Sequence, residues 1–238
     1  MVRSGRTRAE RGQLTGRAVR IPDDTERHVI VGTTGSGKSV FGAWQLSQRS
    51  FDQMPWLIVD FKREPLFEKI PRLEEIRVDG AAPKHRGLYV TRPTVNDIEG
   101  GQVTGMFFRI WERENTGILI DEGYMIPRLD KGLRTLLTQG RSKHIPMINL
   151  SQKPSWISPF LLSESEVKTV FYLEHPYDIE KVREHMRFPA FANPLNLPDH
   201  HSYWYSRKGR EFHYLAPCPA EAEILDIFDR RRVRRGWL

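Results

Sequence analysis

The stretch that decides the fold runs from residue 32 to residue 39 and reads Gly32-Thr33-Thr34-Gly35-Ser36-Gly37-Lys38-Ser39. It matches G-x-x-x-x-G-K-[ST] in full, which is the phosphate-binding P-loop. The apolar run His28 to Val31 precedes it and the helix-compatible segment Val40 to Gln48 follows, so the motif has its strand–loop–helix context. A chance match is the weaker interpretation, and a nucleoside triphosphate with Mg²⁺ is the expected ligand.

Size and composition point to one α/β domain. The chain has 238 residues, of which 39% are hydrophobic and 28% are charged, and this is enough for a real core. No apolar run is long enough to cross a bilayer, and no apolar core follows the N-terminal arginines, so we expect neither a membrane span nor a secretory signal. Cys218 is the only cysteine, which excludes an intrachain disulfide and fits a cytoplasmic protein.

The positive charge lies at the two ends. Residues 1–20 contain six arginines and one glutamate, and residues 230–238 contain five arginines and no acid. Each end thus carries +5 while the whole chain carries +7, so the residues between them sum to −3. Basic arms of this kind often lie on nucleic acid, and solvated tails without a partner are the alternative.

Strand-like and helix-like segments alternate along the chain, which is typical of a mainly parallel sheet with helices on both faces. The following segments are expected as strands: 28–31, 56–60, 88–90, 117–122, 145–150 and 167–173. Helices are expected at 40–50, 65–69, 101–115, 129–140 and 178–186, the last of them capped by Asp178.

A β-hairpin is predicted near the C-terminus. Two alternating aromatic runs between Ser202 and Leu215 flank Lys208-Gly209. Such a surface is able to stack bases, but one face of a hairpin packed on the core is the more common reason for the pattern.

The P-loop acts through its backbone N–H groups, which point at phosphate oxygens at the positive end of the following helix. Lys38 is expected to reach the β- and γ-phosphates, and the Ser39 hydroxyl to bind Mg²⁺. The predicted nucleotide-binding residues are Gly32, Thr33, Thr34, Gly35, Ser36, Gly37, Lys38, Ser39 and Val40.

Two further strands end in residues that suit this chemistry. The run Gly117 to Ile120 is followed by Asp121 and Glu122. Asp121 is expected to hold the hydration shell of Mg²⁺, and Glu122 to orient and polarise the attacking water. The run Ile145 to Ser151 ends in Gln152, an amide able to bind both the γ-phosphate and that water; standing alone, a strand-end glutamine is usually only a surface group.

With these parts in order, residues 28–190 resemble the FtsK/HerA family of P-loop DNA-translocating ATPases. In that family the second strand ends in an acid that is followed by a lysine, as in Asp60-Phe61-Lys62, and the strand after Walker B often ends Thr-Gln-Arg-Pro. Here that stretch reads Ser-Gln-Lys-Pro at residues 151–154, with lysine in place of arginine. The resemblance implies a RecA-like fold and a ring of identical subunits.

The family often carries an arginine finger eleven positions before the glutamine, and Arg141 occupies that position. The resemblance implies that Arg141 acts on the γ-phosphate of a neighbouring subunit. A cation that stabilises the carboxyl end of a helix is the alternative role.

The chain has no room for membrane helices or a winged-helix DNA reader, so the resemblance is strongest to the small genome-packaging ATPases of membrane-containing icosahedral viruses. It implies an ATP- and Mg²⁺-dependent translocase of double-stranded DNA, insensitive to sequence. The expected assembly is a pentameric or hexameric ring at a capsid or portal vertex, in the host cytoplasm or on the virion. The loops 84–86 and 153–158 are candidates for the pore.

Four segments are predicted: a basic arm (1–20), the ATPase core (21–200), a hairpin and C-terminal helix packed on the core (201–229), and a basic tail (230–238). Three alternatives stay open at this point. They are a DNA-transfer translocase of a plasmid or integrative element, a nucleotide or polynucleotide kinase, and a P-loop assembly factor that does not act on DNA.

Overall fold

The computed structural model describes residues 22–23, 25–186, 189 and 192–230. The predicted basic arm and all of the predicted basic tail except Arg230 lie outside these residues. Within the described part, no helix combines the length and the apolar character that a membrane span requires.

A nine-stranded sheet forms the centre of the molecule, in the order β3-β4-β2-β5-β6-β1-β7-β8-β9. All pairs from β3 to β7 are parallel, and the pairs β7–β8 and β8–β9 are antiparallel. The strands are β1 (Arg27–Val31), β2 (Pro55–Asp60), β3 (Glu74–Glu75), β4 (Gly87–Thr91), β5 (Gly117–Asp121), β6 (Met147–Ser151), β7 (Val167–Val170), β8 (Ser202–Ser206) and β9 (Glu211–Leu215). The predicted mainly parallel sheet and the C-terminal hairpin are confirmed.

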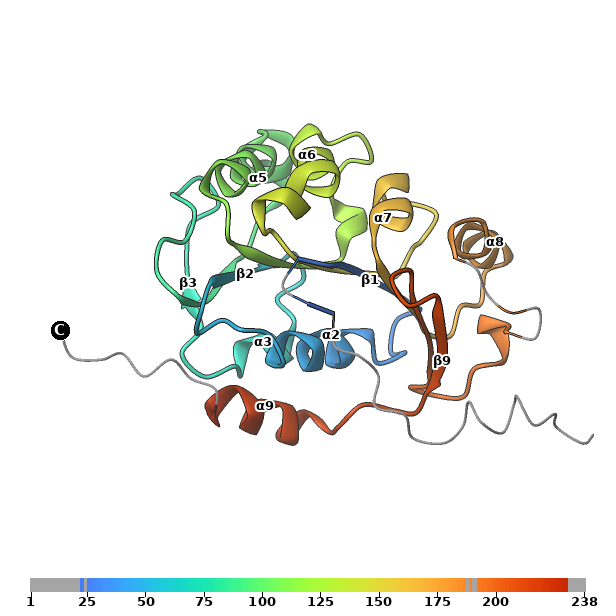
Figure 1. Cartoon of the computed structure of the whole chain (residues 1–238). Coiled ribbons are helices and arrows are strands. Elements are labelled where there is room, and N and C mark those ends of the chain that lie inside the picture. Colours follow the sequence, from blue (N-terminus) through green and yellow to red (C-terminus); the bar gives the residue numbers. More distant parts are fainter. Residues whose placement is uncertain (1–21, 24, 187–188, 190–191, 231–238) are drawn as a thin grey trace, which may run out of the picture.

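Helices cover both faces of the sheet, as predicted (Figure 1). One face carries α5 (Gln102–Arg113), α6 (Lys131–Gln139), α7 (Pro159–Glu164) and α8 (Pro176–His185). The other face carries α2 (Lys38–Ser47), α3 (Pro65–Glu68) and α9 (Glu221–Arg230). The remaining helical segments are α4 (Val95–Glu99) and the short 3-10 turns η1 (Gly123–Met125), η2 (Gly140–Lys143) and η3 (Pro194–Asn196).

The core is split by the sheet into two apolar layers because successive side chains of a strand point to opposite faces. In β1, Val29 and Val31 pack on the side of α5 to α8, while Ile30 packs on the side of α2 and α9. Val29, Ile30 and Val31 are fully buried, so β1 is fixed between two apolar layers, and the loop that follows it starts from a rigid position.

Several predicted boundaries were wrong. The last parallel strand ends at Val170 rather than at residue 173. The helix expected to begin at Asp178 begins at Pro176, and its N-cap is His175, whose ring accepts a hydrogen bond from the Tyr177 N–H. The Asp178 carboxylate instead accepts from the Ser155 N–H at 3.1 Å, so it ties the start of α8 to the loop after β6.

The hairpin continues the sheet beyond β7. Trp204 is fully buried, and Tyr203 packs with the half-buried Phe212 and Tyr214. The core-packing interpretation of the aromatic pattern therefore holds for Trp204 and Tyr203.

Candidate active site

The P-loop connects β1 to α2 and is held between two neighbouring strands. The Gly32 N–H donates to the Ser151 carbonyl of β6 at 3.2 Å, and the Thr33 N–H donates to the Tyr172 carbonyl just after β7 at 3.0 Å. Gly35 and Gly37 have φ values of +77° and +95°, a left-handed conformation that a side chain disfavours. These contacts and turns place the loop at the carboxyl edge of the sheet with α2 directly behind it.

Lys38 lies in the centre of this edge and is buried. Its Nζ is 3.4 Å from the Thr33 carbonyl oxygen and 4.0 Å from Glu122 Oε1. Burial lowers the pKa of Lys38, and the charge of Glu122 opposes that shift. Its ammonium group is thus held under the loop, at the position from which the motif's lysine reaches phosphate.

Asp121 ends β5 and is 1% exposed. Neither of its carboxyl oxygens has a hydrogen-bond partner among the described residues. Burial, followed by the charge of Glu122, raises the pKa of Asp121 to about 7. An orphaned, buried carboxylate of this kind lacks a cation or a donor to stabilise its charge.

This arrangement fits Mg²⁺. The described residues contain no cluster of three His, Cys, Asp or Glu side chains that holds a metal by itself. Mg²⁺ is commonly bound by one or two protein oxygens together with waters and substrate phosphates. Asp121 and the Ser39 hydroxyl at the start of α2 would be those two oxygens.

Glu122 is buried behind Lys38 and has a left-handed backbone, with φ of 58°. Its Oε1 accepts from the Lys62 ammonium and, at 2.5 Å, from Gln152 Nε2, whereas Oε2 has no partner among the described residues. Gln152 Oε1 in turn accepts from the Thr34 hydroxyl of the P-loop at 2.7 Å. Gln152 therefore joins the P-loop to Glu122 directly.

Sequence reasoning did not assign Lys62 to the site. It follows β2, sixty positions before Glu122, and forms an ion pair with it. The available signal was the family pattern of a strand-end acid followed by lysine. Asp60, the acid of that pattern, stands opposite Asp121 in the register of β2 and β5, and Arg92 lies 3.5 Å from it.

Arg141 is the one predicted site residue that the structure does not bring to this edge. It lies in η2, before β6, whereas Gln152 follows the carboxyl end of the same strand. A five-residue strand is about 16 Å long, so the two residues stand at opposite edges of the sheet. The Arg141 side chain is exposed, and no ion pair or side-chain hydrogen bond is found for it among the described residues.

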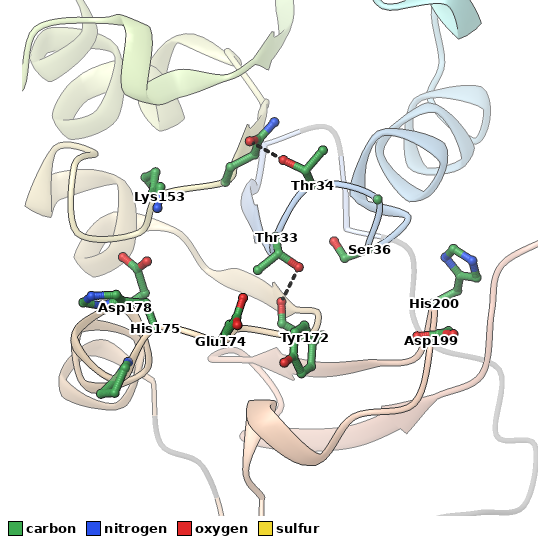
Figure 2. A pocket seen from close by; sticks show the side chains of 13 residues that line it. Thr33, Thr34, Ser36, Lys153, Tyr172, Glu174, His175, Asp178, Asp199 and His200 are labelled. Carbon is green, nitrogen blue, oxygen red and sulfur yellow. Dashed lines mark hydrogen bonds between the residues drawn. The ribbon is translucent and has the colours of Figure 1, made fainter.

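A hollow of about 740 Å³ opens beside the P-loop (Figure 2). Thr33, Thr34 and Ser36 line one side of it, and the segment after β7 lines the other. Three carboxylates lie around it, those of Glu174, Asp178 and Asp199. His200, which precedes β8, stands at its margin against the loop.

This chain is similar to a phage protein over nearly its full length. It is 34% identical over 231 residues to the DNA packaging ATPase P9 of Enterobacteria phage PRD1. The aligned stretch covers 92% of this chain and 99% of that protein. No family model matches the chain.

Two solved structures illustrate the likeness in fold. The genome packaging NTPase B204 of Sulfolobus turreted icosahedral virus 2, in complex with ATP-gammaS, aligns with a TM-score of 0.63 and 15% identity, over 83% of this chain and 100% of that one. VirB4 of Thermoanaerobacter pseudethanolicus aligns with a TM-score of 0.61 and 11% identity, over 83% of this chain and 91% of that one.

The structural likenesses confirm the fold predicted from the P-loop and the strands around it, and the phage protein confirms the resemblance to the genome-packaging ATPases. The identity to the phage protein is high enough, and extends over enough of both chains, to decide the family. The chain belongs to the family of the DNA packaging ATPase P9 of phage PRD1.

Proposed function

We propose that this chain is an ATP-driven translocase that packages double-stranded DNA into a viral capsid, and that it works as a ring of identical subunits. The observation that carries the proposal is the meeting of Lys38, Glu122 and Gln152 at one sheet edge, in a member of a DNA packaging ATPase family. ATP hydrolysis is the reaction, and movement of DNA is what it drives.

The residues at the carboxyl edge of the sheet have different roles in hydrolysis. The P-loop N–H groups and Lys38 bind the phosphates, and Ser39 and Asp121 hold Mg²⁺ with its waters. When bound, Mg²⁺ neutralises charge on the β- and γ-phosphate oxygens. Glu122 takes the proton of the attacking water, and Gln152 contacts the γ-phosphate. Because Gln152 also donates a hydrogen bond to Glu122, the position of Glu122 depends on whether that phosphate is present.

Glu122 needs a free oxygen for this role. Oε1 is occupied by Lys62 and Gln152, while Oε2 has no partner among the described residues. Oε2 is therefore the atom assigned to the attacking water. General-base catalysis of this kind contributes about 10²–10⁴ in rate.

Arg141 completes the site of an adjacent subunit. Its place at the amino edge of the sheet prevents it from reaching the phosphate site of its own chain, which lies at the carboxyl edge. In a head-to-tail ring two different surfaces meet at each interface, and in the proposed ring these are the amino edge of one subunit and the carboxyl edge of the next. An arginine supplied in this way typically accelerates phosphoryl transfer about 10³–10⁵-fold.

The DNA is bound through its phosphates, because a packaging enzyme must pass any sequence. Two loops are candidates for this contact, and they lie at opposite edges of the sheet. Residues 84–86 are all exposed, whereas in 153–158 only Lys153 and Trp156 are exposed. Residues 84–86 precede β4, whereas residues 153–158 follow β6 and carry the exposed Trp156. The enzyme acts in the host cytoplasm, at a capsid or portal vertex.

ATPase rate with and without double-stranded DNA, together with the mass of the assembled species, tests the proposal. We expect Mg²⁺-dependent hydrolysis that DNA of any sequence stimulates, from a pentameric or hexameric species. The Lys38→Ala variant controls for contaminating ATPases. An ATPase rate that DNA does not change, together with a protein that stays monomeric when ATP and DNA are present, would overturn the translocase assignment.

A further inference from the structure

Asn149 is a polar residue in an apolar layer of the core. It lies in β6 and is 1% exposed, and neither its amide nitrogen nor its amide oxygen has a hydrogen-bond partner among the described residues. In the parallel register it stands beside Ile120 of β5 and Val29 of β1. A buried amide without a partner costs free energy that an apolar side chain does not. The packing of the core therefore gives no reason for an amide at this position.

The alternation of side chains along the strands shows which face of the sheet the amide occupies. Ile148 and Leu150 belong to the layer beside α2, so Asn149 points to the opposite face, toward α5 to α8. On β5, Ile120 packs toward α5 to α8, so Asp121 points to the face of α2. The sheet thus separates Asn149 from the metal position at Asp121. Any part that the amide takes in hydrolysis must pass through another residue.

The amide of Asn149 lies directly against Gly123. A Cβ built on Gly123 would overlap both the nitrogen and the oxygen of that amide, so position 123 has no space for a side chain. Gly123 is buried, begins η1 and directly follows Glu122. Asn149 therefore touches the backbone turn that carries the proposed general base.

This turn has an unusual backbone. Glu122 has φ of 58° and ψ of 57°, the left-handed conformation, which is unfavourable for a residue with a side chain. The Met125 N–H donates to the Glu122 carbonyl at 2.9 Å, and the Ile126 N–H donates to the Gly123 carbonyl at 3.3 Å. Such conformations persist only where the surroundings hold them, and they cluster at active sites.

Strand β6 thus contacts the segment of the general base at two points. Gln152 Nε2 donates to the Glu122 carboxylate, and the Asn149 amide lies against the backbone one residue further on. A general base must lie within hydrogen-bond reach of the proton that it takes. A displacement of about 1 Å is able to cost two orders of magnitude in rate, so the exact orientation of this turn matters to turnover.

We propose that Asn149 is a positioning residue for ATP hydrolysis. Its amide, which carries both donors and an acceptor, hydrogen-bonds the backbone of the Glu122–Gly123 turn when Glu122 Oε2 meets the attacking water. The bond forms in the reacting state and is absent from the structure described here. The inference rests on the proposed role of Glu122 as the general base, and it adds the residue that aims this base.

Two variants of the same shape, Asn149→Val and Asn149→Thr, separate positioning from packing. Both side chains suit a strand, but only threonine has a hydroxyl that donates and accepts hydrogen bonds. We expect Asn149→Val to raise the midpoint of thermal unfolding by about 2–4 °C, because an apolar side chain replaces the unpaired amide. The same variant is expected to lower kcat about tenfold or more, with KM for ATP within about twofold of wild type.

Asn149→Thr is expected to keep more of the turnover than Asn149→Val, because its hydroxyl is able to bond the turn. Ile148→Val, on the opposite face of the same strand, is the matched control. It should lower the unfolding midpoint and leave kcat within about twofold. Wild-type turnover in Asn149→Val, or equal loss in the valine and threonine variants, overturns the proposal. An unfolding midpoint of Asn149→Val below that of wild type also overturns it, because the amide would then be paired before the reaction.

The path through Glu122 is tested by combining variants. Because Asn149 acts only by aiming Glu122, adding Asn149→Val to Glu122→Gln should lower turnover by no more than about twofold. A full additional loss in the double variant would contradict this path.

Glu122→Gln alone keeps two failures apart. Wild-type hydrolysis in Glu122→Gln would contradict the assignment of the base itself. Slow hydrolysis in Glu122→Gln together with wild-type hydrolysis in Asn149→Val would contradict only the role of Asn149.

Discussion

The chemistry of this protein concentrates on a few buried charged side chains. Lys38, Asp121 and Glu122 are each at least 96% buried, and their environments push the pKa of Lys38 down and that of Asp121 up. Charged groups are rarely fully buried unless they are paired, and the Asp121 carboxylate has no hydrogen-bond partner among the described residues. The site is thus built for a highly charged ligand.

Glu122→Gln tests the assignment of the general base. The amide keeps the shape of the side chain but cannot take a proton, so turnover is expected to fall about 10²–10⁴-fold. ATP binding is expected to stay within a few-fold of wild type, since Glu122 is not assigned to bind the nucleotide. Rapid-quench turnover and equilibrium binding of a labelled ATP analogue measure the two effects.

Hydrolysis at the wild-type rate in Glu122→Gln would remove the base assignment. Asp60→Asn is a useful companion, because Asp60 lies in register with Asp121 at the same sheet edge and is bound by Arg92. It is expected to disturb turnover less than Glu122→Gln does.

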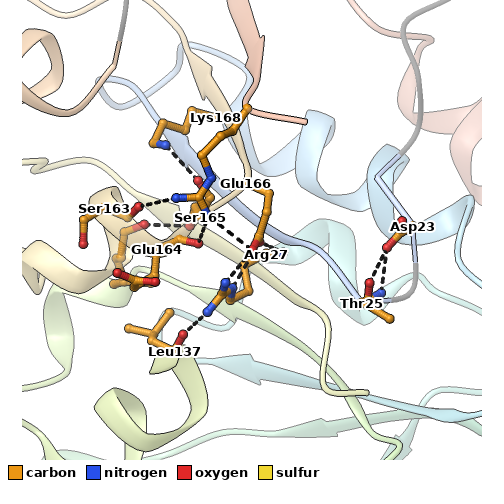
Figure 3. Close-up of polar contacts among 11 residues, drawn as sticks. Asp23, Thr25, Arg27, Leu137, Ser163, Glu164, Ser165, Glu166 and Lys168 are labelled. Carbon is orange, nitrogen blue, oxygen red and sulfur yellow. Dashed lines mark hydrogen bonds and ion pairs between the residues drawn. The ribbon is translucent and has the colours of Figure 1, made fainter. Parts of the chain in front are cut away.

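Lys168 is a buried charge outside the active site (Figure 3). Its ammonium donates to the Ser165 carbonyl at 2.8 Å, and nearby Glu166 is already paired with Arg27. Burial, followed by the charge of Arg207, lowers the pKa of Lys168 to about 8. The folded state therefore carries this charge at a cost at neutral pH.

Lys168→Met is expected to raise the free energy of unfolding at pH 7 by about 1–3 kcal/mol. Because the unfolded lysine titrates near 10.5 and the folded one near 8, wild type regains stability as pH rises through that window. At about pH 10 the difference in free energy of unfolding between Lys168→Met and wild type should therefore be smaller than at pH 7. Urea unfolding at both pH values measures it.

Exposed Lys131→Met is the control and should change stability by less than about 0.5 kcal/mol at either pH. A Lys168→Met variant that is less stable than wild type at pH 7 would show that the hydrogen bond to Ser165 outweighs the burial of the charge.

At the scale of elements, the register between β2 and β5 determines which strand-end carboxylates lie together at the active site. Trp56 of β2 pairs with Gly117 of β5, and the same register brings Asp60 opposite Asp121. A Cβ built on Gly117 would lie 2.2 Å from the Trp56 ring, so the indole occupies the space of a side chain at position 117. The first position of β5 therefore has room only for glycine.

Gly117→Ala is accordingly expected to destabilise the fold by about 1–3 kcal/mol through overpacking. Gly105→Ala in α5 is the matched control, because there the new methyl meets only the flexible end of Arg109. The control should be neutral or stabilise by up to about 1 kcal/mol, since alanine favours helix. Thermal unfolding of the two variants side by side measures the contrast, and equal effects would contradict the packing argument.

How far the sequence predicts these elements depends on the range of the interactions that make them. The P-loop, the strand-end acids and Gln152 follow from local patterns, because parallel strands bring their carboxyl ends to one edge. The Lys62–Glu122 ion pair depends on a contact between segments sixty residues apart, which no local pattern encodes. Helices α4 and α7 were not predicted, because five or six residues are too few to show a helical periodicity in the sequence.

At the scale of the whole molecule, the two edges of the sheet carry different chemistry. The carboxyl edge holds the site, whereas the amino edge holds Arg141 with no ion pair found for it among the described residues. Two different surfaces that complement each other produce a head-to-tail assembly, which forms a ring when the rotation between subunits closes. The account therefore requires that each active site be shared by two subunits.

Mixing two inactive variants tests this requirement most directly. Arg141→Ala keeps its own Glu122 but supplies no finger, and Glu122→Gln supplies the finger but has no base. Each variant alone is expected to lose about 10²–10⁴ or more of the DNA-stimulated ATPase rate.

Random rings of the two variants in equal amounts join an intact Glu122 to an intact Arg141 at about a quarter of the sites. The account predicts that the DNA-stimulated ATPase rate of the mixture recovers toward about a quarter of the wild-type rate. A mixture whose subunits exchange, yet which remains as inactive as its two components, would contradict the shared site.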